Sequence, residues 1–120
     1  NLVSTTGKKI NAYYSNYYTS VINDYKGYLA TKDYYKALKK HYLLARILSK
    51  DTNEIEVALN ETGKYQKLIA ILQFSQNDCC LDYVQKQLKE LNIEWSNRYS
   101  VIKKLRDIVN NIAHQYIEAQ

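Results

Sequence analysis

The sequence predicts an all-α protein, an antiparallel bundle of four or five helices joined by short loops. Proline is absent from the 120 residues and glycine occurs three times, although an average protein contains about 5% proline and 7% glycine. Apolar residues recur at intervals of three and four along most of the chain, which is the period of one helix face. We therefore expect more than two-thirds of the residues to be helical and none to lie in a sheet. The length suits one hydrophobic core, so residues 1–120 are expected to form a single helical domain.

Two helices are expected in the N-terminal part of the chain. Apolar residues follow helical spacing from Ile10 to Leu29, and residues 4–6 carry hydroxyl groups that can cap a helix start. The second helix is expected over residues 32–49. Its apolar residues cover about half of the circumference at ~100° per residue, so this helix should pack against more than one neighbour.

The remaining helices are predicted from capping residues and heptads. Asp51 and Glu54 have the spacing of a capping box, which predicts the start of a third helix. Gly63 predicts a break or kink in that helix, because glycine costs about 1 kcal/mol in a helix interior. A long heptad pattern follows, and it allows either one helix over residues 79–118 or a break between residues 92 and 97. We expect eight of the apolar side chains to lie in the core: Leu38, Ala45, Leu48, Ile69, Leu72, Leu105, Val109 and Ile112.

Positive charge is concentrated in the first part of the chain. The net charge is +5. Residues 1–50 hold nine basic and two acidic side chains, whereas residues 51–120 hold eight basic and ten acidic ones. On the second helix the basic side chains fall within about 120° of arc. These side chains, here called the basic stripe, are Lys32, Lys36, Lys39, Lys40, Arg46 and Lys50. Such a stripe is either a solvated surface or a binding face for a polyanion such as a nucleic acid.

Tyrosine is the most unusual component of the sequence. There are thirteen tyrosines against one phenylalanine and one tryptophan, and nine of the tyrosines precede residue 43. A tyrosine buries its ring while its hydroxyl still needs a polar partner, so it suits interfaces better than deep cores. The narrow apolar stripe from Leu81 to Trp95 is a second candidate surface. We expect the anchors of a protein interaction surface to be Tyr13, Tyr14, Tyr17, Tyr18 and Tyr25.

The sequence contains no recognisable catalytic or metal-binding motif. His41 lies on an apolar helix face, and His114 is four residues before Glu118, the spacing of a helix-surface pair. Cys79 and Cys80 are adjacent, which fits neither a metal-ligand spacing nor a disulfide framework. We therefore expect free thiols, a weak preference for a reducing compartment, no metal, no cofactor, no small-molecule substrate and no enzymatic activity.

Two expectations concern the nature of the chain. No apolar stretch approaches the ~18 residues of a spanning helix, so we expect a soluble protein without a membrane span. Methionine is absent, which indicates a processed chain or a fragment. The sequence thus favours a non-enzymatic helical interaction or assembly module that binds another protein or itself. The alternative is a nucleic-acid-binding, packaging or coat protein that uses the basic stripe.

Overall fold

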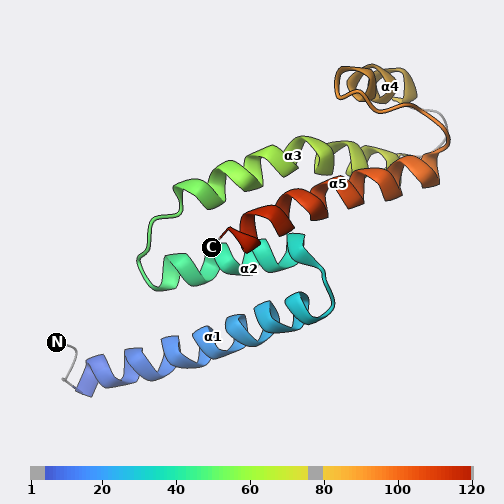
Figure 1. Ribbon diagram of the computed structural model, residues 1–120. Coiled ribbons are helices and arrows are strands. Elements are labelled where there is room, and N and C mark those ends of the chain that lie inside the picture. Colours follow the sequence, from blue (N-terminus) through green and yellow to red (C-terminus); the bar gives the residue numbers. More distant parts are fainter. Residues whose placement is uncertain (1–4, 76–79, 120) are drawn as a thin grey trace.

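All regular secondary structure in the described part of the chain is helical. A computed structural model describes residues 5–75 and 80–119, and within these ranges it describes side chains from Ser15 onward. Five α-helices and no strand lie in these ranges. The predicted all-α class and the predicted helical share of more than two-thirds are therefore confirmed. The helices, drawn in Figure 1, are α1 (Thr5–Ala30), α2 (Tyr34–Ile47), α3 (Asn53–Phe74), α4 (Leu81–Glu90) and α5 (Arg98–Glu118).

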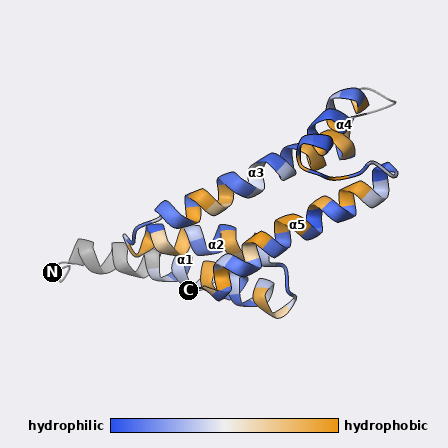
Figure 2. Cartoon of the chain, turned by 45° about the horizontal axis from the view of Figure 1, so that its top comes forward, coloured by the Kyte–Doolittle hydropathy of each residue, from blue (hydrophilic) through white to orange (hydrophobic). Residues whose placement is uncertain are grey.

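The helices form an elongated array in which α1 lies at one edge. In Figure 1, α1 runs from left to right, α2 returns, α3 runs to the right again and α5 returns. Among the described helices, α1 lies close to the backbone of α2 alone, whereas α2 also contacts α3 and α5, and α3 also contacts α4 and α5. The array measures 60 × 31 × 25 Å. Apolar and polar residues alternate along α3 and α5 (Figure 2), as expected for helices with one buried face.

Helix α1 is longer than α2 and extends past it. Three contacts fix the register: Asp24 pairs with Lys40, Tyr25 with His41, and Tyr28 with Lys36. In two antiparallel helices the numbers of facing residues have a nearly constant sum, and here it lies between 64 and 66. The end of α2 at Ile47 therefore lies beside residue 18 of α1. Residues 5–17 therefore continue beyond α2 for roughly 20 Å at 1.5 Å per residue. We call this segment the overhang, and it is visible in Figure 1.

A side chain from α5 holds the connection between α1 and α2. The Asn110 Oδ1 atom accepts hydrogen bonds from the backbone N–H groups of Tyr34 (2.7 Å) and Tyr35 (3.1 Å). The Asn110 Nδ2 group donates to the carbonyl oxygen of Lys32 at 2.9 Å. Asp33 is the residue that precedes α2, and its side chain accepts a longer bond from Lys36 N at 3.4 Å. Asn110 thus satisfies two of the N–H groups that a helix start leaves without an intrahelical partner.

The core consists of two neighbouring clusters of buried side chains. One joins α3, α4 and α5 around Leu72, Leu88 and Leu105, and the other joins α2, α3 and α5 around Leu38 and Ile55. Six of the eight predicted core residues are buried: Leu38, Ala45, Ile69, Leu72, Leu105 and Val109.

Two predicted core residues are not buried. Leu48 is 47% exposed because it follows the last residue of α2 and lies in the connection to α3. Ile112 is half-buried, since the adjacent Ala113 takes the inward position on α5. Both residues were assigned to the core from helical spacing alone. Leu48 is exposed because α2 ends before it, and Ile112 is only half-buried because the smaller Ala113 takes the inward position.

The structure confirms that a third helix starts within residues 51–54, but it corrects the predicted capping interaction and the predicted kink. The capping box is wrong: Thr52 precedes α3, and the Asp51 carboxylate accepts a bond from Asn53 N at 2.9 Å instead. Gly63 does not break α3. It lies on the exposed side with open space around its Cα, so the helix loses no packing there, while the adjacent Thr62 is fully buried.

The C-terminal heptad pattern is divided between two helices, as one of the two interpretations expected. The chain leaves α4 after Glu90, and Asn92 adopts a positive φ of 60°. Asn97 caps α5 by accepting a bond from Ser100 N at 2.9 Å. Because Val84 and Leu88 of α4 are buried against α3 and α5, the stripe from Leu81 to Trp95 belongs to the core. Its prediction as a second interaction surface is wrong.

The prediction of free thiols is also wrong for Cys80. This residue is disulfide-bonded and precedes α4 with a φ of 74°. Cys79, the only other cysteine of the sequence, lies outside the described residues.

Candidate functional site

The five predicted tyrosine anchors do not form one exposed surface. Tyr17 is 43% exposed, whereas Tyr18 and Tyr25 are half-buried. The Tyr25 ring lies 5.8 Å from the His41 ring of α2, and this burial raises the pKa of Tyr25. Tyr25 therefore packs against α2, and Tyr18 is only partly exposed. The side chains of Tyr13 and Tyr14 lie outside the described residues, although both positions belong to the overhang of α1.

The basic stripe is exposed except at Lys40, which forms a 3.4 Å ion pair with Asp24 of α1. Lys36 lies 3.6 Å from the Asp33 carboxylate. The Lys39 and Arg46 groups lie over tyrosine rings of their own helix at 5.2 and 5.8 Å. A cation over an aromatic ring keeps its full charge, so the stripe retains most of its positive field.

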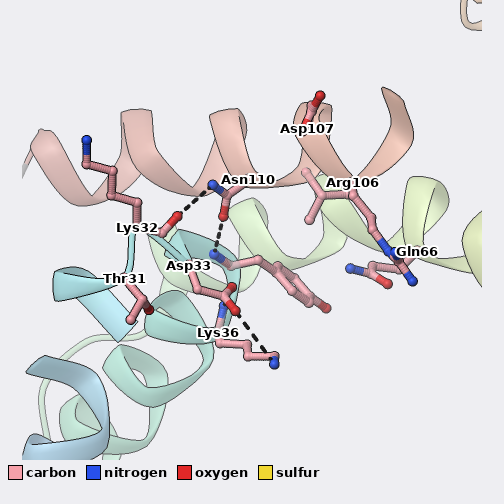
Figure 3. A pocket seen from close by; sticks show the side chains of 10 residues that line it. Thr31, Lys32, Asp33, Lys36, Gln66, Arg106, Asp107 and Asn110 are labelled. Atoms are coloured by element: carbon pink, nitrogen blue, oxygen red, sulfur yellow. Dashed lines mark hydrogen bonds and ion pairs between the residues drawn. The ribbon is translucent and has the colours of Figure 1, made fainter. Parts of the chain in front are cut away.

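A polar pocket of about 460 Å³ lies at the N-terminal end of the stripe (Figure 3). Arg106 of α5 lines this pocket together with Lys32 and Lys36. Figure 3 shows the Arg106 side chain directed toward Gln66 of α3. Sequence analysis missed Arg106, because it is far from the stripe in sequence and only the packing of α5 on α2 brings it there. The carboxylates of Asp33 and Asp107 also line the pocket and reduce its positive charge.

A second pocket of about 440 Å³ surrounds His41, and we call it the His41 pocket. Tyr116 of α5 meets the His41 ring edge-on with the ring centroids 5.9 Å apart. Burial lowers the pKa of His41, and the positive charge of Lys50 lowers it further. The pocket is formed by residues of four helices and one loop: Tyr18, His41, Leu44, Ala45, Leu48, Lys50, Asp51, Glu54, Ile55 and Tyr116.

The remaining candidate chemistry is limited. His114 Nε2 lies 2.9 Å from a Glu118 carboxylate oxygen, which confirms the predicted pair, and the His114 ring stacks on Tyr34. In the described ranges no three histidine, cysteine or carboxylate side chains gather as metal ligands do. None of the described helices combines the length and apolar character that crossing a membrane requires.

Comparisons with protein-family models, with curated proteins and with solved structures found no match to this chain.

Proposed function

We propose that this chain is a non-enzymatic helical interaction module that associates with another protein chain through the overhang of α1. One observation carries the proposal: among the described helices α1 lies close to the backbone of α2 alone, and its residues 5–17 continue past the end of α2. An isolated helix of this length is marginal in water. A partner that packs on the overhang would stabilise this helical segment, which α2 is too short to cover.

The composition of the overhang supports the same proposal. It contains Tyr13, Tyr14 and Tyr17, and the last of these is 43% exposed. Tyrosine is enriched at protein interfaces because it combines a large apolar ring with a polar hydroxyl. Tyr18 and Tyr25 are half-buried, so the proposed anchors are reduced to these three residues.

A second copy of the chain is the simplest partner. Two overhangs could lie against each other around a two-fold axis, so that each buries the tyrosines of the other. In each copy the overhang would project from an antiparallel bundle of α1, α2, α3 and α5, with α4 packed at the end of the bundle away from the overhang. An overhang of roughly 20 Å offers less area than a permanent interface of about 1,600 Å² needs. We therefore expect a reversible dimer.

Light scattering at several protein concentrations tests this proposal. The measured mass should rise from 14.1 kDa toward twice that value as concentration increases. Tyr13→Ala combined with Tyr17→Ala should keep the chain monomeric, and α1 should survive because alanine favours helix. The matched control is Tyr83→Ala combined with Tyr99→Ala, since Tyr83 has the same 43% exposure as Tyr17. A wild-type mass that stays at 14.1 kDa, or two double variants that associate equally, would contradict the proposal.

The alternative function, nucleic-acid binding, is favoured by the exposure of the basic stripe and by the addition of Arg106 at its end. The structure makes Lys40 a poor residue to reverse, because a glutamate there would face Asp24. Lys39→Glu with Arg46→Glu is the better test, with Lys103→Glu and Lys104→Glu on α5 as the equally charged control. Weaker oligonucleotide binding and a salt slope that falls by about one unit per lost phosphate contact, in the first variant only, would support this alternative.

A further inference from the structure

The His41 pocket is lined by three aromatic rings and carries two carboxylates, Asp51 and Glu54, against one lysine, Lys50. Elsewhere in the described part of the chain, lysine and arginine groups lie over four tyrosine rings, 5.2 to 5.8 Å from their centroids. In the described part of the chain no lysine or arginine group lies over the rings of Tyr18, His41 or Tyr116, which line the pocket. A tyrosine ring whose face is not covered by a cation of the protein attracts the positive charge of a ligand.

The pocket is lined by charges of both signs. Lys50 lies near enough to His41 to lower the pKa of the imidazole, together with burial. Burial raises the pKa of Tyr116, and the negative charge of Glu54 and Asp51 raises it further. A positive ligand beside the Tyr116 ring would therefore meet a negative potential. The lowered pKa of His41 also means that the imidazole adds no opposing charge at neutral pH.

His41 leaves hydrogen-bonding capacity unused at the wall of the pocket. It makes ring contacts with Tyr25 and Tyr116, but it forms no hydrogen bond with any part of the chain that the structure describes. A neutral imidazole offers one donor and one acceptor. Leu44, Leu48 and Ile55 supply the apolar part of the lining. This combination of apolar wall, aromatic faces and a few polar groups is typical of small-molecule sites.

We propose that the His41 pocket binds a small organic cation, an alkylated or protonated amine whose positive centre lies between the Tyr18 and Tyr116 rings and the Glu54 carboxylate. Its volume of about 440 Å³ lies within the range of ordinary ligand pockets. The apolar side chains contact the alkyl groups of the ligand, and the imidazole of His41 bonds to a hydroxyl group when the ligand carries one. This site is separate from the overhang and does not depend on the proposed self-association.

Choline and its uncharged isostere 3,3-dimethylbutan-1-ol test the proposal, because they share one shape and differ in charge. Binding is followed by calorimetry and by the chemical shifts of the His41 and Tyr116 rings. Choline should bind saturably and shift both rings, and the isostere should bind at least about tenfold more weakly. Equal affinity for the two probes, or no saturable shift with choline, would overturn the proposal.

Matched variants separate this pocket from general attraction to an acidic surface. Glu54→Gln should weaken choline binding roughly two- to fivefold. Glu61→Gln removes the same charge from an exposed position of α3 outside the pocket and should have no effect. Tyr18→Leu should reduce binding further while it keeps the apolar volume, and it remains informative if the corresponding Tyr116 variant fails to fold. An equal loss in the Glu54 and Glu61 variants would show that the pocket is not the site.

Discussion

Replacing Asn110 by alanine should destabilise the protein far more than the same change one residue later. The Asn110 side chain accepts two hydrogen bonds from the start of α2 and donates one to Lys32 O. Each such bond contributes about 1 kcal/mol net, and the loss of a helix cap alone costs about 0.5–2 kcal/mol. The two freed N–H groups are partly buried. We therefore expect Asn110→Ala to lower the free energy of unfolding by about 2–3 kcal/mol.

Asn111→Ala is the matched control, since Asn111 is exposed on the same helix. Both changes give α5 the same gain in helix propensity, so the difference between the variants isolates the hydrogen bonds. In urea, monitored by circular dichroism, the midpoint of Asn110→Ala should lie roughly 1–2 M below that of the control for an m-value of about 1.5 kcal/mol/M. Asn110→Asp keeps the acceptor but loses the donor, so its stability should be intermediate. A difference below about 0.5 kcal/mol between the two alanine variants would refute this account.

Two further predictions concern the core and the pH dependence. Leu105 is fully buried, so Leu105→Ala should lower the free energy of unfolding, measured in urea melts, by about 2–5 kcal/mol. Leu48 is 47% exposed, so Leu48→Ala should lower it by less than about 1 kcal/mol. Similar losses in the two variants would show that the core is misplaced. The pKa of His41 is lowered from 6.5 in the folded protein, so below about pH 6.5 the unfolded chain binds more protons than the folded one. The free energy of unfolding should therefore be independent of His41 above that pH and should fall as the pH decreases below it. His41→Gln should reduce this fall between about pH 7.5 and pH 5 relative to His114→Gln, and equal slopes in the two variants would contradict the assignment.

The sequence predicted the helices well because their signals are local. The three–four spacing of apolar residues and the absence of proline were sufficient for α1, α2 and α5. Errors arose where a local signal competed with tertiary packing. Gly63 favours a break, but the buried Thr62, Leu68 and Ile69 hold α3 together on both sides of it.

The candidate sites were less predictable because they depend on contacts between distant segments. The tyrosines of α1 appeared equivalent in sequence, yet the end of α2 at Ile47 separates the half-buried Tyr18 and Tyr25 from those of the overhang. The His41 pocket was not predicted, because its aromatic and acidic residues come from elements between residues 18 and 116. No spacing rule joins residues so far apart, although His41 itself was identified as a histidine on an apolar face.

The elongated shape has a practical consequence for hydrodynamic measurements. The Cα radius of gyration is 18.5 Å, while a compact chain of this length would have about 14 Å. By the same scaling, a compact protein with the observed radius would contain roughly 270 residues. A single copy will therefore leave a gel-filtration column earlier than a globular protein of the same mass. Elution volume alone would therefore overstate the mass of a monomer, whereas scattered intensity, which follows mass and not shape, separates a monomer from a dimer.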